Sequence, residues 1–95
     1  MNSFNDPLNT AVFTTRFVIK DGELIHHVFH HEDDGAWEFT GATQAQDDKD
    51  YMVVALEEII MRDATVMELS DLPLGEGAYR PSKDAPWQRF ELENH

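Results

Sequence analysis

Residues 12–31 have the sequence V-F-T-T-R-F-V-I-K-D-G-E-L-I-H-H-V-F-H-H, which sets the expected fold of the chain. β-Branched and aromatic side chains dominate residues 12–20 and 23–31, and this composition predicts two strands. Between them, Asp21 and Gly22 form the dipeptide that is typical of a two-residue type I′ turn. The stretch therefore predicts a β-hairpin, with its register fixed by the turn.

The next residues extend this hairpin into a meander. An acidic turn at 32–35 leads into a third strand at 36–41. If this turn holds four residues, the register of all three strands follows, because side chains alternate between the two faces. The expected cross-strand pairs are Ile19–Leu24, Phe17–His26, Thr15–Val28, Phe13–His30, His30–Trp37 and Val28–Phe39. The expected core face carries Phe13, Phe17, Ile19, Leu24, Val28, Trp37 and Phe39, and the opposite face includes Val12, Val18, Ile25 and Phe29.

The second half of the chain predicts a helix and a closing hairpin. Residues 42–50 are polar and acidic, which indicates a surface loop, and 51–55 is a short apolar strand. Apolar residues then follow helical spacing, and Asp63 can cap a second helical turn. The apolar positions with this spacing are Leu56, Ile59, Ile60, Val66, Met67 and Leu69. Proline and glycine in 72–75 end the helical region. The final strands are expected at 77–80 and 87–92, with a turn at 81–86.

The whole chain is expected to form one α+β domain over residues 1–95. It would hold an antiparallel β-meander of five to six strands, with one or two short helices packed on one face. Residues 1–10 are polar and are expected to be loosely attached. With 95 residues, of which 41% are hydrophobic, the chain can build a single modest core.

Composition points to a soluble protein of a reducing compartment. The chain contains no cysteine, which excludes disulfides and thiolate metal clusters. Its start lacks the basic and apolar segments of a signal peptide, and no apolar run is long enough to cross a bilayer. These features favour a cytoplasmic location.

The net charge of −12 limits the classes of partner. Such a field repels phosphate backbones and anionic lipids, so the sequence predicts neither nucleic-acid nor membrane binding. A basic protein would instead be attracted, with faster association at low salt. The same acidity also serves solubility alone.

Four histidines at His26, His27, His30 and His31 are the most conspicuous chemical cluster. On a helix such spacing could chelate a metal, but successive side chains on a strand point to opposite faces. Four strand residues also span about 13 Å, too far for one ion. Structural or surface roles are therefore expected, with two alternatives left open. One is a metal site that uses these histidines with the acidic turn, and the other is a response to pH near neutrality.

No pattern in the chain predicts catalysis. Cysteine is absent, no serine lies in a nucleophile elbow, and no glycine-rich phosphate loop occurs. Nineteen carboxylates are too many to single out a catalytic pair, and neither acidic run has the spacing of a calcium loop. We expect a non-enzymatic protein without cofactor, with an enzyme acting on a cationic small molecule as the weakest alternative.

A protein-binding site is the better-supported expectation. An exposed tryptophan beside arginines is typical of a binding hot spot, and the acidic turn could meet basic groups. The candidate binding residues are Trp37, Arg80, Trp87, Arg89, Asp33 and Asp34. Trp37 is also expected in the core, and the two arginines could instead hold an anion or offset neighbouring acids.

Three short motifs resemble those of a family of small uncharacterised bacterial domains. They are D-G-A-W-E-F at 34–39, V-V-A-L-E-E-I at 53–59 and D-L-P-L-G at 71–75, followed by Ala78 and Arg80. Some members of that family resemble immunity proteins of polymorphic toxin systems. The resemblance implies a cytoplasmic bacterial protein without catalysis that neutralises a toxin by binding it.

Taken together, the sequence predicts a non-catalytic protein-binding module, of which an immunity-type inhibitor is one form. The alternative is a metal- or pH-responsive regulatory domain that uses the four histidines. A homodimer is also left open, in which Val18, Ile25 and Phe29 would be buried between subunits.

Overall fold

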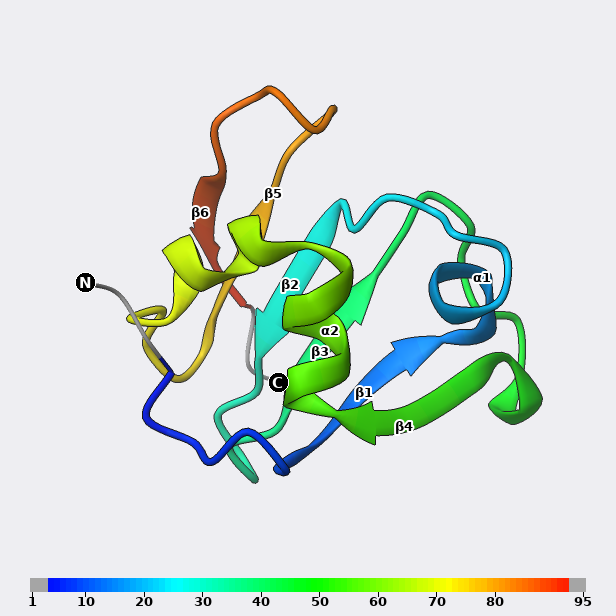
Figure 1. Ribbon diagram of the computed structural model, residues 1–95. Helices are drawn as coiled ribbons and strands as arrows, with labels where there is room; N and C mark the ends of the chain where they lie inside the picture. Colours follow the sequence, from blue (N-terminus) through cyan, green and yellow to red (C-terminus); the bar gives the residue numbers. More distant parts are fainter. Residues whose placement is uncertain (1–3, 93–95) are drawn as a thin grey trace.

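The computed structural model describes residues 4–92 and confirms the α+β class. Six strands form one mixed sheet in the order β4-β1-β3-β2-β5-β6 (Figure 1). The strands are β1 Ala11–Thr15, β2 His27–His30, β3 Trp37–Thr40, β4 Tyr51–Ala55, β5 Glu76–Tyr79 and β6 Gln88–Glu91. The α-helices are α1 Arg16–Ile19 and α2 Leu56–Arg62, and the 3₁₀-helices are η1 Asp48–Asp50 and η2 Ala64–Leu69.

The first predicted hairpin is wrong, because the strand ends at Thr15. The Thr15 hydroxyl accepts a hydrogen bond from the Val18 amide at 3.3 Å and starts α1 in place of a longer strand. Gly22 has a φ of 74°, but no non-glycine residue within 4–92 has a positive φ, so Asp21 cannot complete a type I′ turn. The first two strands are therefore not neighbours.

β1 instead pairs in parallel with β3 and antiparallel with β4. The sheet is consequently mixed and not a pure meander, and the four pairs predicted across the first hairpin do not occur. This rearrangement also inverts the predicted faces of the N-terminal region. Val12 is fully buried, whereas Phe13 is 40% exposed on the opposite face. Val18 and Ile25, predicted away from the core, are buried in it.

The remaining predictions of local structure are largely confirmed. β2 and β3 form the expected antiparallel hairpin, with His30 opposite Trp37 and Val28 opposite Phe39. β4 spans the predicted residues, and Asp63 caps η2 by accepting a hydrogen bond from the Thr65 amide at 3.0 Å. β5 and β6 form the closing hairpin.

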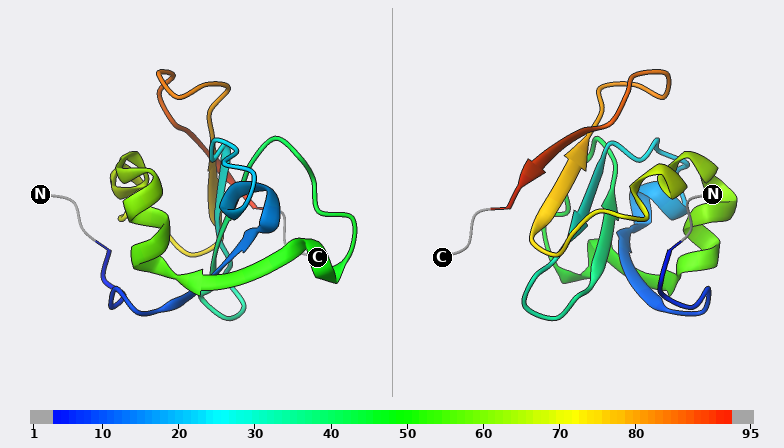
Figure 2. Two further views of the ribbon diagram at one scale, coloured as in Figure 1. Left: turned by 45° about the vertical axis from the view of Figure 1, so that its right-hand side comes forward. Right: turned by 90° about the vertical axis from the view of Figure 1, so that its left-hand side faces the viewer.

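The core lies between the sheet and the helices of one side. Figure 2 (left) shows α2 on one side of the sheet and the loop of residues 41–50 on the other. The buried apolar side chains come from the inward positions of the strands, from α1, α2 and η2, and from the segments that precede β2 and follow η2. They are Val12, Val18, Ile25, Val28, Trp37, Phe39, Leu56, Ile59, Val66, Leu69, Leu72 and Ala78.

The N-terminal segment contacts this core, in contrast to the loose attachment expected for residues 1–10. Phe4 meets the Trp37 ring edge-on, with ring centroids 5.0 Å apart. The indole Nε1 of Trp37 donates a hydrogen bond to Asp6 Oδ2 at 2.8 Å. Residues 1–3 of the expected loose segment lie outside the described part of the chain.

Candidate functional site

The sheet face opposite α2 and η2 is rich in exposed apolar side chains, and we call it the open face. Successive side chains of a strand point to opposite faces of the sheet. The buried strand residues Val12, Val28, Phe39 and Ala78 therefore mark the core face. Their neighbours on the open face are Phe13 of β1, Phe29 of β2, Glu38 of β3 and Gly77 of β5. Eight large hydrophobic residues are exposed within 4–92, and five of them belong to the open face. Those five are Phe13, Tyr51, Val53, Tyr79 and Phe90. Exposed apolar side chains gathered in this way are one feature of interaction surfaces, so the open face is the candidate site.

Aromatic rings form a continuous strip across β2, β5 and β6. His27 and Phe29 stack with ring centroids 6.0 Å apart, and His27 lies 5.0 Å from Tyr79. Phe29 continues the strip to Phe90 at 6.3 Å and to His31 at 6.1 Å. Each ring limits the rotamers of the next, so the strip presents a preorganised surface.

Gly77 allows the Phe90 ring to lie close to the backbone of the sheet. A Cβ atom at Gly77 would come within 2.7 Å of the Phe90 ring and 3.1 Å of the Val28 carbonyl oxygen. Such contacts are far shorter than ordinary carbon–carbon contacts. The absence of a side chain at Gly77 therefore leaves the space that the Phe90 ring occupies.

Two hollows lie beside the strip, and Tyr51 borders both. The larger hollow, of about 730 Å³, lies between strand residues and the loop of residues 41–46. The smaller hollow, of about 440 Å³, has aromatic and acidic walls, and we call it the acidic hollow. Its lining residues are Phe13, His31, Asp33, Asp34, Ala36, Glu38, Asp48 and Tyr51.

None of the lysines and arginines of residues 4–92 lines either hollow. Within the acidic hollow, His31 Nε2 lies 2.8 Å from Glu38 Oε1. Outside the acidic hollow, Arg16 Nε donates a hydrogen bond to Asp50 Oδ1 at 2.8 Å. The pKa of Asp50 is lowered by the hydrogen bond from the Gln46 amide, and further by Arg16.

The four histidines divide between the two sides of the sheet. His26 and His30 bond backbone carbonyls through Nδ1, at 2.9 Å to Arg80 and 2.7 Å to Leu72, and His30 also stacks on Trp37. His27 and His31 instead belong to the open face. Within residues 4–92, no three potential ligands from His, Cys, Asp and Glu come together in a way that could hold a metal ion. The predicted metal alternative therefore lacks a preformed site in this part of the chain.

Desolvation by burial lowers the pKa of His27, and the neighbouring His26 lowers it further. The ring is half-buried and lies beside Phe29 and Tyr79, which displace part of its water. The lowered pKa favours the neutral form of His27 on the open face.

The predicted binding residue Arg80 is structural. Its side chain is 1% exposed, forms an ion pair with Asp63, and donates hydrogen bonds to Thr65 Oγ1 at 2.8 Å and to the Ile25 carbonyl at 3.1 Å. Burial alone would raise the pKa of Asp63, but hydrogen bonds from Thr65 and Arg80 outweigh it and lower the pKa. Arg80 is therefore unavailable to an external partner.

The other predicted binding residues lie in different places. Trp37 is buried in the core, and Trp87 is half-buried, with Arg80 over its ring at 4.1 Å. Arg89 donates a hydrogen bond to Asp71 Oδ1 at 2.6 Å, so the two arginines each hold a carboxylate and do not form a joint anion site. Only Asp33 and Asp34 reach the open face, as lining residues of the acidic hollow.

Sequence reasoning missed Tyr51, Val53, Tyr79 and Phe90, and placed Phe13 in the core. The alternation in β4 carried a usable signal, because Tyr51 and Val53 share one face. The assignment of Phe13 failed because the pairing of β1 was wrong.

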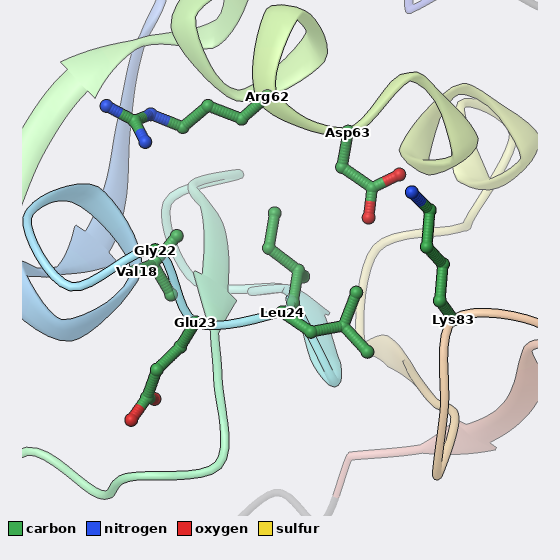
Figure 3. Close-up of a pocket in the computed structure, with 8 residues that line it drawn as sticks. Val18, Gly22, Glu23, Leu24, Arg62, Asp63 and Lys83 are labelled. Atoms are coloured by element: carbon green, nitrogen blue, oxygen red, sulfur yellow. The ribbon is translucent and has the colours of Figure 1, made fainter.

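A third pocket, of about 400 Å³, lies on the helix side of the sheet (Figure 3). Three of its four charged lining residues already have partners in hydrogen bonds or ion pairs, namely Glu23, Arg62 and Asp63. Arg62 donates a hydrogen bond to Glu58 at 2.9 Å, Asp63 pairs with Arg80, and Glu23 accepts hydrogen bonds from Thr43. In Figure 3 the Lys83 amine points toward the Asp63 carboxylate. This pocket leaves a ligand little to bind, so the open face is the better candidate site.

No helix within residues 4–92 combines the length and the apolar character that a bilayer crossing requires. Comparison of the chain with models of protein families, with curated proteins and with solved structures finds no match.

Proposed function

We propose that this chain is a non-catalytic protein-binding module and that the open face is its binding surface. The observation that carries the proposal is the gathering of five of the eight exposed large hydrophobic residues on the one sheet face that neither α2 nor η2 covers. Rigid aromatic side chains are the usual anchors of protein interfaces.

The partner is a basic protein. The chain has a net charge of −12, and the acidic hollow adds four carboxylates to the open face. Complementary charge would steer such a partner toward the open face. It would disfavour a second copy of this chain, because the two acidic hollows would repel each other. The predicted dimer through Val18, Ile25 and Phe29 loses support for another reason, since Val18 and Ile25 are buried within one subunit.

The resemblance to immunity proteins makes the proposal more specific. In that form, the chain acts in the bacterial cytoplasm and neutralises a basic toxin by covering it. Inhibition by stoichiometric binding needs no catalytic residue, and a preorganised face lowers the entropic cost of binding.

Capture with matched variants tests the proposal. Wild-type chain, Val53→Glu and Met61→Glu are immobilised and exposed to a lysate of the native host. Val53 lies on the open face and is 60% exposed, whereas Met61 lies on α2 and is 78% exposed. Both variants add the same charge, so only the position differs.

We expect a basic protein to be retained by wild type and by Met61→Glu, and to be lost by Val53→Glu. Mass spectrometry identifies it, and titration of the purified protein then gives the affinity. Equal retention by all three chains, or loss in both variants, would show that the open face is not the binding surface.

A second candidate function is regulation by pH. The observation that favours it is the position of His27 on the open face, where protonation of a ring within the aromatic strip would place positive charge in the interface. It predicts that the affinity for a basic partner falls between pH 7.5 and pH 5.5, and a constant affinity over that range would remove it.

A further inference from the structure

The open face has two chemically different halves. The half formed by β2, β5 and β6 presents His27, Phe29, Tyr79 and Phe90, together with Gln88. Strand alternation turns Glu76 and Glu91 to the other side of the sheet. This half therefore carries aromatic rings and no carboxylate from its own strands.

The other half contains the acidic hollow. Phe13 is 40% exposed and Tyr51 is 45% exposed, and both rings line the hollow. Carboxylates of Asp33, Asp34 and Asp48 lie around these rings. Exposed aromatic walls and acids thus occur in the same hollow, at one end of the aromatic strip.

Such walls match the chemistry of an arginine side chain. A guanidinium stacks on aromatic faces and bonds carboxylates through a planar fork of donors. An ammonium group is more strongly hydrated and lacks the planar surface, so lysine gains less from the two rings. The ring of Phe17 already carries Arg16 in this manner, with the guanidinium carbon 4.5 Å from the ring centroid.

We infer that the acidic hollow receives an arginine side chain of the partner while the aromatic strip covers an adjoining apolar patch. The inference rests on the proposed function, because it assigns partner chemistry to the same open face. It fixes the orientation of the partner as well, since only one end of the face accepts the positive charge. Binding of this kind would use charge for orientation and apolar burial for affinity.

A displayed library of random peptides provides the probe. Selection is carried out on the immobilised wild-type chain, and the enriched peptides are measured against four variants. Val53→Glu and Met61→Glu report whether a peptide uses the open face. Two double variants report whether it uses the acidic hollow. One combines Asp33→Asn with Asp34→Asn, and the other, the control, combines Asp21→Asn with Asp84→Asn.

The two double variants are matched in charge. Each removes two exposed carboxylates and leaves the same net charge, so long-range attraction is equal in both. Asp33 Oδ1 and Asp34 Oδ1 accept backbone hydrogen bonds, which asparagine can also accept, so the turn is preserved. Asp21 and Asp84 line neither hollow of the open face.

We expect the enriched peptides to combine arginine with aromatic or aliphatic residues and to lose binding to Val53→Glu. Their affinity should fall roughly threefold to tenfold in the Asp33, Asp34 variant and stay unchanged in the Asp21, Asp84 variant. Replacing the arginine of the tightest peptide by citrulline, which keeps the shape but not the charge, should cause a similar loss.

Different results separate the two proposals. Peptides that need the open face but contain no essential arginine, or that lose affinity equally in both double variants, would overturn the arginine assignment and leave the binding face intact. Selection that yields no peptide sensitive to Val53→Glu would overturn both.

Discussion

Arg80 links three parts of the chain that are far apart in sequence. Its guanidinium pairs with Asp63 before η2, bonds the Ile25 carbonyl before β2, and lies over the Trp87 ring before β6. A buried charge is costly unless it is fully paired, and here both partners and hydrogen bonds are present. The residue therefore holds the segments on the helix side of the sheet together.

Removal of the Arg80 side chain should therefore destabilise the fold strongly. Arg80→Ala leaves the Asp63 carboxylate without its ion pair and should lower the free energy of unfolding by about 3–5 kcal/mol. Arg89→Ala serves as the control, because Arg89 and Asp71 form a pair with side chains 38% and 71% exposed. That variant should lose less than about 1 kcal/mol. Urea unfolding measures both, and equal losses would contradict the structural role of Arg80.

His27 should make the stability of the fold depend on pH. Its pKa is lowered in the folded state by burial and then by His26, so the unfolded chain binds a proton at higher pH than the folded chain does. The free energy of unfolding should then decrease as the pH falls below about 6.5. His27→Phe keeps a ring between Phe29 and Tyr79 and should reduce this decrease.

Unfolding by urea at pH 7.5 and pH 5.5 measures the effect, and NMR titration gives the pKa of His27 directly. An identical loss of stability in wild type and in His27→Phe would show that other groups are responsible.

At the scale of elements, the N-cap at Thr15 decides the topology. Its hydroxyl satisfies the Val18 amide and ends β1, and the chain turns away from the sheet through α1. β1 is then free to lie between β3 and β4. Threonine is favoured in strands as well as at helix caps, so local composition alone could not choose between the two.

This difference explains how much of the fold the sequence could predict. The β2–β3 hairpin, β4, the Asp63 cap and the β5–β6 hairpin depend on neighbouring residues, and all were predicted. The parallel pairing of β1 with β3 joins segments about 25 residues apart and has no local signal. The open face depends on that pairing, so the candidate site could be predicted only in part, through Asp33, Asp34 and the two open-face histidines.

Substitutions in β1 test the observed orientation of the strand. Val12 is fully buried, so Val12→Ala should lower the free energy of unfolding by about 2 kcal/mol. Phe13→Ala should cost less than Val12→Ala, although phenylalanine is larger, because its ring is 40% exposed. With the predicted hairpin the order would be reversed, and a Phe13→Ala loss of about 3–5 kcal/mol would support that arrangement instead.

At the scale of the whole molecule, the two sides of the sheet differ in composition. The side of α2 and η2 holds the core and the buried Arg80–Asp63 pair. The open face carries exposed rings, two histidines and the acidic hollow. Substitution of the most exposed open-face residue, Val53, should thus alter binding with little loss of stability.

Salt should modulate the association. Attraction between the −12 chain and a basic partner is screened over about 8 Å at physiological ionic strength. The association rate should therefore fall steeply as salt rises, while the dissociation rate, set by the apolar contacts, changes less. Surface plasmon resonance at several salt concentrations measures both rates, and rates independent of salt would contradict a basic partner.

The most direct measurement is NMR mapping of the bound surface. A ¹⁵N-labelled chain is titrated with the captured partner, or with the tightest selected peptide, and the shifted amide resonances are assigned. The account predicts that the largest shifts fall on Phe13, Phe29, Tyr51, Val53, Tyr79 and Phe90, while α2 and η2 stay unchanged. Shifts centred on α2, η2 or the pocket of Figure 3 would show that the open face is not the binding surface.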